Sequence, residues 1–210
     1  MARIKSEVRE QFLNQTRQAL INAAAEEIAR QGYDLANINT ISTQAGFAKG
    51  TVYNYFPTKQ ALLTALIDNI AQEHFEYMQA AIHDISDPVA RLKSFFKAGF
   101  EYVTSHMPRA RAMFNTVYSS NQEQKNHCFQ AYQPIFRLMA EQILMPGIQE
   151  EKFRQVEPGS TAILLMTIYL GTASQVDEQG RPWLNPENVA DFVLHALSTV
   201  KETRSLGERI

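Results

Sequence analysis

The chain has 210 residues, a net charge of −2 and 45% hydrophobic residues, enough apolar sequence for one sizeable core or two modest ones. A single cysteine, Cys128, excludes an internal disulfide framework, and the polar N-terminal stretch MARIKSEVREQF has no secretion-signal pattern. The longest apolar run, residues 162–170, is far shorter than a membrane span. We therefore expect a cytoplasmic protein that makes no contact with a membrane.

The first 60 residues have the hydrophobic spacing of three helices. Between residues 14 and 31, apolar side chains recur every three or four positions, and Gly32 ends the run. Asn37 is the expected N-cap of a short second helix, which Gly46 ends in a left-handed conformation. A third, equally short helix is predicted for residues 49–55, just before a proline.

The rest of the chain also has helical spacing, interrupted mainly near prolines. The first three expected helices begin at Thr58, after Asp87-Pro88, and after a break at 106–108. The next is expected at 129–143, where Pro134 either starts the helix or kinks it. The last two are expected from Pro158 to about 175 and from 187 to about 200. We expect interruptions at 145–147 and 177–186, and a frayed tail after residue 200. No repeat and no convincing alternating strand pattern occurs, so the predicted fold is all-α.

The two short helices, joined through residues 46–48, are a predicted helix-turn-helix, whose second helix is of the kind that enters a major groove. Val52 and Phe56 lie four positions apart and share the inner side of this second helix. The outer side then presents Gly50, Thr51, Tyr53, Asn54 and Tyr55. The helix therefore buries two apolar side chains and exposes a flat, hydroxyl-rich surface.

That surface has the chemistry of a DNA contact. Gly50 lets a phosphate approach the backbone near a helix N-terminus, and Lys49 and Lys59 add positive charge at either end. Tyrosine hydroxyls can donate to phosphate oxygens, while Asn54 and Thr51 are short groups of the type that contact base edges. Residues 1–60 also have a net charge of +2 against −4 for the remainder, a weak asymmetry in the same direction. Exposed glycines and tyrosines are common, however, so the bare pattern leaves a merely structural role open.

The joint spacing of ten residues resembles the DNA-binding domain of the TetR family of bacterial transcriptional regulators. They are Ile41, Ala45, Gly46, Lys49, Gly50, Thr51, Tyr53, Phe56, Pro57 and Lys59. The resemblance is close over about residues 14–66 and implies a three-helix DNA-binding domain at 1–58, with the helix-turn-helix at about 37–56. It also implies an effector-binding and dimerisation domain at 59–210, and a homodimer on a palindromic operator.

By the family pattern, DNA contacts come from two neighbouring helices. Those of the second short helix and its flank are Lys49, Gly50, Thr51, Tyr53, Tyr55 and Lys59, and those at the start of the preceding helix are Asn37 and Asn39. Asn54, on the same outer side, completes the predicted DNA-binding set.

Three positions depart from the family pattern. Ser42 remains small, Phe47 replaces a usual valine, and Ala48 replaces the usual serine at the N-cap of the recognition helix. Alanine forgoes a cap that contributes about 1 kcal/mol. We therefore expect the recognition helix to be less ordered without DNA.

The C-terminal part is dense in aromatic rings and thioethers, which either line an apolar cavity or simply fill a core. The resemblance favours a cavity for a small hydrophobic effector, and we predict Phe100, Tyr118, Phe136 and Met166 to line it. The last two helices, at about 158–175 and 186–200, resemble the dimerisation pair of the family, with burial inside one subunit as the alternative.

No spacing indicates a catalytic or metal site. The histidines are scattered, the neighbours His127 and Cys128 diverge by about 100° on a helix, and one cysteine cannot make a cysteine-rich metal site. We predict no enzyme activity, no metal and no cofactor.

The function predicted from the sequence is a repressor that a hydrophobic effector releases from its operator, with an activator as the rarer alternative. The second hypothesis is a helical ligand-binding or protein-interaction module whose DNA-binding half is vestigial and would bind DNA weakly and without sequence preference.

Overall fold

The computed structural model describes residues 2–177, 179 and 181–199, with the side chains of the first helix described from residue 7 onward. In this part of the chain every regular element is helical, which confirms the predicted all-α fold. The elements are α1 (Ala2–Leu35), α2 (Ile38–Gln44), α3 (Lys49–Tyr55), α4 (Lys59–Ile82), α5 (Pro88–Ser105), α6 (Met107–Val117), α7 (Gln122–Ala131), α8 (Gln133–Met139), the π-helical turn η1 (Ala140–Leu144), α9 (Met145–Gln149), α10 (Pro158–Ala173) and α11 (Pro186–Leu197). No described helix combines the length and the apolar character that crossing a bilayer requires.

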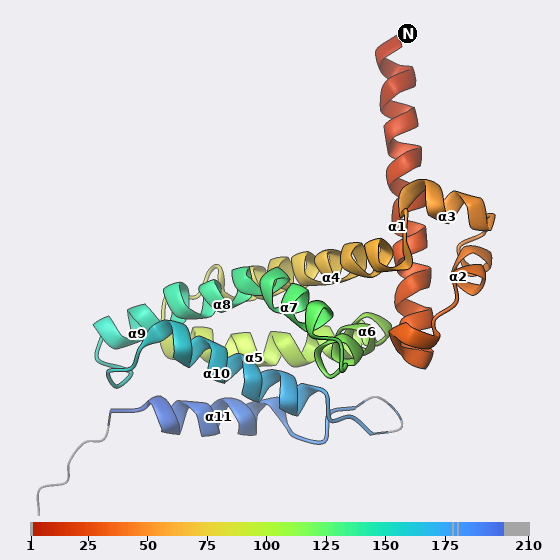
Figure 1. Cartoon of the computed structure of the whole chain (residues 1–210). Helices are drawn as coiled ribbons and strands as arrows, with labels where there is room; N and C mark the ends of the chain where they lie inside the picture. Colours follow the sequence, from red (N-terminus) through yellow and green to blue (C-terminus); the bar gives the residue numbers. More distant parts are fainter. Residues whose placement is uncertain (1, 178, 180, 200–210) are drawn as a thin grey trace, which may run out of the picture.

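The helices form a small group at one end and a larger bundle beside it (Figure 1). Helices α2 and α3 lie next to α1, and α4 leaves this group to run along the larger bundle, which contains α5 to α11. The first turns of α1 project away from both groups. Helix α4 packs against α1 at its start and against α5, α7 and α8 further on, and α1 packs against α6, so the buried residues of both groups form one continuous core.

The first helix is longer than its hydrophobic pattern predicts. It begins at Ala2 and not near residue 14, because Val8 and Phe12 lie on an exposed stretch and leave no buried stripe to recognise. The predicted stop at Gly32 is confirmed, since this glycine has φ +76° and leaves the helical conformation. At the other end of the chain, α11 ends at Leu197 and the tail 201–210 lies outside the described residues.

The prediction for residues 129–147 was wrong in two places. Residues 129–131 belong to a separate helix, α7, whereas the alternative in which Pro134 starts a helix is confirmed, since Pro134 lies in the first turn of α8. The expected interruption at 145–147 is absent, because the chain passes from η1 directly into α9. Pro146 cannot donate to the carbonyl of Gln142 four residues earlier. Arg91 of α5 donates to that carbonyl at 2.8 Å, so the helix continues without an unpaired acceptor.

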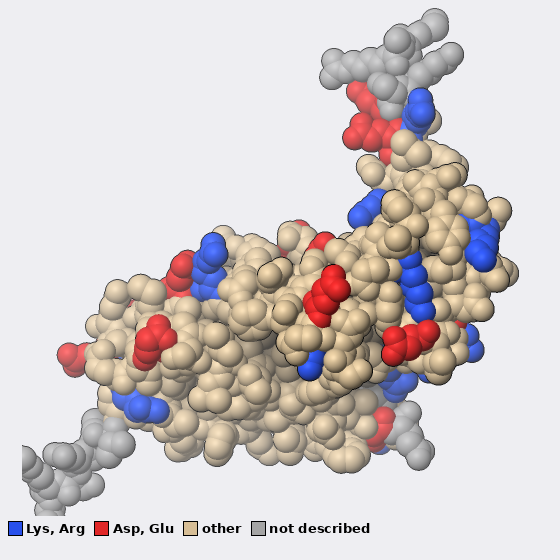
Figure 2. Space-filling view, in the orientation of Figure 1, with Lys and Arg blue, Asp and Glu red and all other residues tan. Residues whose placement is uncertain are grey.

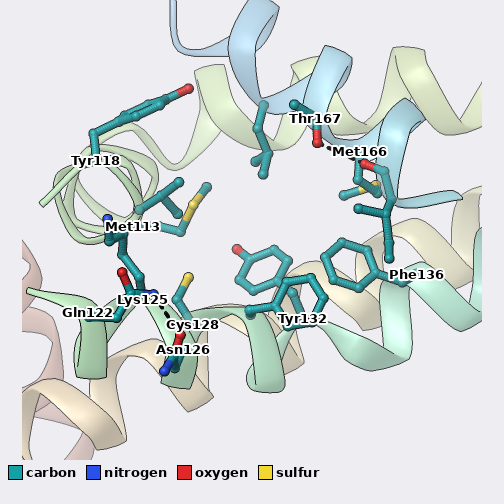
Figure 3. Close-up of a pocket in the computed structure, with 14 residues that line it drawn as sticks. Met113, Tyr118, Gln122, Lys125, Asn126, Cys128, Tyr132, Phe136, Met166 and Thr167 are labelled. Atoms are coloured by element: carbon teal, nitrogen blue, oxygen red, sulfur yellow. Dashed lines mark hydrogen bonds between the residues drawn. The ribbon is translucent and has the colours of Figure 1, made fainter. Parts of the chain in front are cut away.

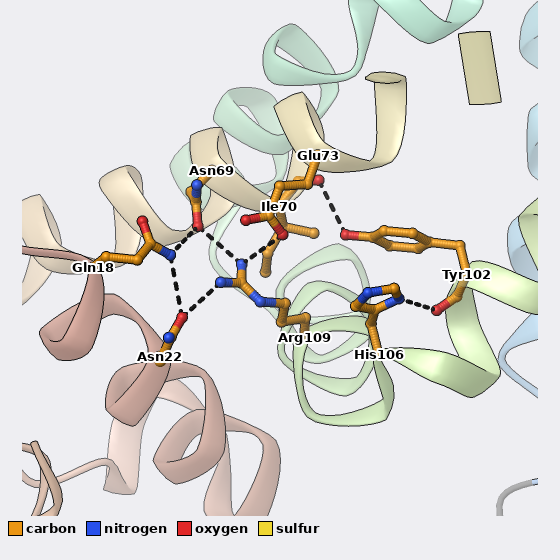
Figure 4. A network of polar contacts seen from close by, with 8 residues as sticks. All are labelled: Gln18, Asn22, Asn69, Ile70, Glu73, Tyr102, His106 and Arg109. Carbon is orange, nitrogen blue, oxygen red and sulfur yellow. Dashed lines mark hydrogen bonds and ion pairs between the residues drawn. The ribbon is translucent and has the colours of Figure 1, made fainter. Parts of the chain in front are cut away.

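A polar cluster joins α1, α4 and α6 where the two groups of helices meet (Figure 4). The guanidinium of Arg109 donates to Asn69 at 2.9 Å and to Asn22 at 2.7 Å, and it pairs with Glu73 at 3.1 Å. Gln18 of α1 also donates to Asn69, at 3.0 Å. These bonds fix the N-terminal helices to the larger bundle through side chains, besides the covalent connection.

The buried carboxylate of Glu27 closes the connection between α1 and α2. It accepts from the side chains of Arg30 and Gln31 and from the backbone N–H of Asn37, the last at 3.2 Å. Burial raises the pKa of Glu27, but these hydrogen bonds and the nearby guanidinium outweigh it and lower the pKa below 4.5. The charged form therefore stabilises the start of the helix-turn-helix.

We expect Glu27→Gln to lower the free energy of unfolding by about 1–3 kcal/mol, because an amide offers one acceptor where the carboxylate offers two. A lowered folded pKa means that the carboxylate stabilises the fold above pH 4.5 and that this contribution is lost as the pH falls further. Urea unfolding of both proteins between pH 7 and pH 3 measures this. Curves that stay equally far apart at every pH would contradict the role of the charge.

Candidate functional site

The turn between α2 and α3 has the geometry that the sequence predicts. Asn37 caps α2, its side chain accepting from the N–H of Asn39 at 2.8 Å. Gly46 has φ +78°; its N–H donates to the carbonyl of Thr43 at 3.1 Å, and the next N–H, of Phe47, donates to Ser42 at 2.8 Å. This pair of bonds is a Schellman motif, which ends α2 and aims the chain into α3.

Helix α3 presents the predicted side to solvent. Val52 and Phe56 are buried, whereas Lys49, Gly50, Tyr53 and Asn54 are exposed and Thr51 and Tyr55 are partly buried. Figure 2 shows a basic patch at the end of the molecule that holds α2 and α3, and scattered side chains of both signs over the larger bundle. The orientation inferred from helical spacing is confirmed, and it leaves the tyrosine at 53 with 43% of its surface exposed.

Gly50 lies in open space near the start of α3. A Cβ added here would meet no heavy atom within 4 Å, and its φ is not positive. Neither packing nor backbone conformation therefore requires glycine within the described chain. The free approach to the backbone of the first turn suits contact with an external group such as a phosphate.

The ammonium of Lys59 already has two partners within the chain. Its ammonium donates to the carbonyl of Asp34 at 3.0 Å and lies 4.6 Å from the centre of the Tyr33 ring. The side chain thus fastens the start of α4 to the end of α1. Its charge remains at the edge of the α3 surface, where the sequence places it.

A cavity of about 380 Å³ lies in the larger bundle between α6, α7, α8 and α10 (Figure 3). Its lining residues are Met113, Val117, Tyr118, Gln122, Lys125, Asn126, Cys128, Phe129, Tyr132, Phe136, Ile163, Met166, Thr167 and Leu170. Three of the four residues predicted from the sequence, Tyr118, Phe136 and Met166, line this cavity. Phe100 does not: its ring is buried in the core and packs edge-on against Tyr169, with 6.0 Å between ring centres.

The sequence reasoning missed the wall that α7 contributes, because it assigned no helix to residues 122–128. That wall supplies the polar groups of Gln122, Lys125 and Asn126. A signal was present: Asn121 is an N-cap whose side chain accepts from the N–H of Gln124 at 3.1 Å.

One wall of the cavity is hydrogen-bonded to α4 through a buried imidazole. The hydroxyl of Tyr132 lies 3.4 Å from Nδ1 of His74, and the hydroxyl of Tyr169 lies 3.2 Å from Nε2. Tyr169 donates its proton to the carbonyl of Gly99 at 2.9 Å, so it accepts from Nε2–H, and Tyr132 donates to Nδ1. Burial, with a smaller contribution from His106, lowers the pKa of His74 to about 3, so this imidazole is neutral at physiological pH.

The histidine and cysteine neighbours do not form a reactive pair. The imidazole of His127 bonds to Asp68 at 2.8 Å, while Cys128 is buried, and burial raises the pKa of its thiol to about 12. Among the described residues no group of three or more His, Cys, Asp or Glu side chains is placed to hold a metal ion.

Comparison with known proteins finds similar sequences and folds among transcriptional regulators. Residues 20–66 match the family model described as bacterial regulatory proteins of the tetR family. The chain is 25% identical over 174 residues to the fatty acid metabolism regulator protein of Bacillus subtilis, which covers 83% of this chain and 86% of that protein.

Two solved structures have the same fold at low identity. One is the transcriptional regulator FadR from Bacillus subtilis in complex with stearoyl-CoA, with a TM-score of 0.75, 22% identity and coverage of 87% and 97% of the two chains. The other is AibR in complex with isovaleryl coenzyme A and operator DNA, with a TM-score of 0.70, 20% identity and coverage of 87% and 98%.

The N-cap of α3 offers a direct test of its local stability. Ala48 has extended backbone angles, φ −72° and ψ 151°, and makes no side-chain cap bond. We expect Ala48→Ser to add about 1 kcal/mol of stability, because a serine oxygen accepts from an N–H of the first turn. Thermal unfolding of the two proteins measures the shift, and an unchanged or lower melting temperature would contradict this cap assignment.

Proposed function

We propose that the chain is a repressor of the TetR family of bacterial regulatory proteins, whose family model matches residues 20–66, and that an apolar effector releases it from its operator. Its DNA-binding regulator function follows from the matched domain and from the regulators that it resembles. We assign DNA binding to residues 1–58 and effector binding and dimerisation to residues 59–210. The observation that carries the proposal is the exposed polar side of α3 with open space at Gly50.

In this proposal α3 lies in the major groove. The contacts come from the exposed residues of α3, from Lys59 beside it, and from Asn37 and Asn39 at the start of α2. The side-chain oxygen of Asn37 caps α2, so its side-chain NH₂ group remains available to a phosphate or base.

Dimerisation through α10 and α11 is supported by the apolar side chains that these helices expose. Leu164 of α10 is 59% exposed and Phe192 of α11 is 67% exposed. A second copy of the chain would cover these side chains around a two-fold axis, and the pair would then read a palindromic operator. Large apolar side chains gathered on one pair of helices are typical of such an interface.

The effector would act through α6, the end of α7 and α4. Helix α6 contributes to the cavity wall and carries Arg109, which bonds to α1 and α4. Tyr132 at the end of α7 bonds to His74 of α4. A ligand that moves these walls therefore shifts α4 and with it α3, with a coupling of about 1–3 kcal/mol that must act equally in both directions.

The mostly apolar lining supports an apolar effector. Two regulators of the same fold are described with acyl thioesters, one with stearoyl-CoA and the other with isovaleryl coenzyme A, in which an apolar acyl chain is joined to a charged coenzyme A group.

Tyr53→Phe and Lys59→Ala test the DNA surface. Each should weaken binding to labelled DNA from upstream of the protein's own gene, measured by gel shift with unrelated competitor DNA. Loss of one phosphate contact by Lys59→Ala should also reduce the slope of log K against log salt by about 0.9.

Matched controls for these variants are Tyr77→Phe and Lys97→Ala, which change an exposed tyrosine and an exposed lysine on α4 and α5. Because Lys59 also bonds to Asp34, the melting temperature of its variant is measured as well. Wild-type DNA affinity in both test variants would rule out the proposed surface, and wild-type binding that vanishes with competitor would favour a vestigial DNA-binding half.

Phe192→Glu tests the dimer. A carboxylate at the centre of an apolar interface should convert the dimer to a monomer in sedimentation equilibrium and weaken operator binding, because the two half-sites are no longer linked. Met145→Glu, at an exposed apolar position on α9, is the control and should leave both properties unchanged. A variant at 192 that remains as dimeric as wild type would refute the interface.

A further inference from the structure

One charged side chain lines the cavity, and it has no partner. Among the described lining residues, Lys125 is the one that carries a charge. Its ammonium forms no hydrogen bond or ion pair within the described part of the chain, although it is only partly exposed. The nearest acidic residue along α7, Glu123, does not line the cavity, and Asp68 is paired with His127. The cavity therefore has an uncompensated positive charge.

Three polar side chains of α7 gather at one end of the cavity, where Met113 and Cys128 also lie, and Thr167 is the polar residue labelled near the other end in Figure 3. Figure 3 shows Gln122, Lys125 and Asn126 together at one end, while Phe136 and Met166 lie toward the other. The side-chain amide of Gln122 donates to Asn126 at 2.9 Å, which holds these two groups beside the lysine. A ligand that fits both ends must itself have a polar end and an apolar end.

We propose that the effector is an anionic amphiphile, whose negatively charged head binds Lys125 and whose apolar chain extends toward Phe136 and Met166. The inference rests on the proposed function, because it names the ligand class of the same cavity. A charge-assisted hydrogen bond to an ammonium is about twice as strong as a neutral one, and it strengthens where apolar walls exclude water.

Other ligand classes fit the lining less well. A purely apolar molecule would cover part of the Lys125 side chain and leave its ammonium unpaired beside it, which costs free energy. A cationic amphiphile would be repelled by the same ammonium. A multiply charged, wholly polar ligand would have to displace water from an apolar wall formed by three helices.

Two sources supply this chemistry, namely a free fatty acid and an acyl thioester with a phosphorylated head. Both have an apolar chain and an anionic head, so the test includes both. The full-length protein is titrated by calorimetry with four probes of one chain length, below their micelle concentrations. These probes are dodecanoate, dodecanoyl-coenzyme A, dodecanol and dodecyltrimethylammonium.

We expect the wild-type protein to bind at least one of the two anionic probes about tenfold or more tightly than dodecanol. Lys125→Met, which keeps an unbranched side chain one atom shorter and removes its charge, should lose about tenfold in affinity for that anion and leave dodecanol unchanged. Lys97→Met, at an exposed lysine of α5 outside the cavity, is the matched control and should bind as wild type does. The preferred anion identifies the source.

Lys125→Glu reverses the charge at this position, so this variant should bind dodecyltrimethylammonium more tightly than dodecanoate. Equal binding of dodecanol and both anions by the wild type, an unchanged affinity in Lys125→Met, or no binding of any probe would overturn the inference. Operator binding, measured for each protein without ligand, separates the two proposals. Operator binding without amphiphile binding refutes the ligand class alone, and amphiphile binding without operator binding refutes the repressor alone.

Discussion

The shared helix α4 is the constraint on which the arrangement depends. Its first turn is capped by Thr58, whose hydroxyl accepts from the N–H of Ala61 at 3.0 Å, and residues 56–58 alone separate it from α3. From Leu62 to Ile82 it contributes buried side chains to the one continuous core, first beside α1 and then among the helices of the larger bundle. Because only three residues join its start to α3, a shift of α4 in the larger bundle moves the attachment of α3. The two surfaces of the molecule are therefore mechanically connected by ordinary packing.

Two hydrogen-bonded clusters join α4 to the neighbouring helices at defined positions. On the side of α6, Arg109 binds Asn69 and Glu73 of α4, together with Asn22 of α1. Deeper in the bundle, His74 of α4 lies between Tyr132 and Tyr169 and stays neutral. In the described part of the chain every buried side-chain nitrogen and oxygen has a partner. A wall movement must therefore either carry these partners with it or break bonds in a low-dielectric interior, where each broken bond is costly.

How well the sequence predicted the structure depends on how local the signal is. The helix-turn-helix was predictable because glycines, N-caps and the pair Val52 and Phe56 act over a few residues. Helix α7 was missed because most of its residues are polar and only Gln124 and Cys128 are buried, which leaves no apolar spacing to recognise. The helix continues past Pro146 because of a hydrogen bond from Arg91, some 50 residues away in sequence. For the same reason Phe100 could not be separated from Phe136: each is an aromatic residue on a helix, and which one borders a cavity is set by the packing of other helices.

The weakness of α3 on its own gives small movements a large effect. A helix of seven residues is marginal in water, and this one lacks a side-chain cap and contains Gly50 near its start. Its position is held by the burial of Val52 and Phe56 and by its connections to α2 and α4. In the proposed mechanism an effector in the cavity therefore need not unfold or displace a whole domain, because a small tilt of α4 would move one of the connections that hold α3 in place.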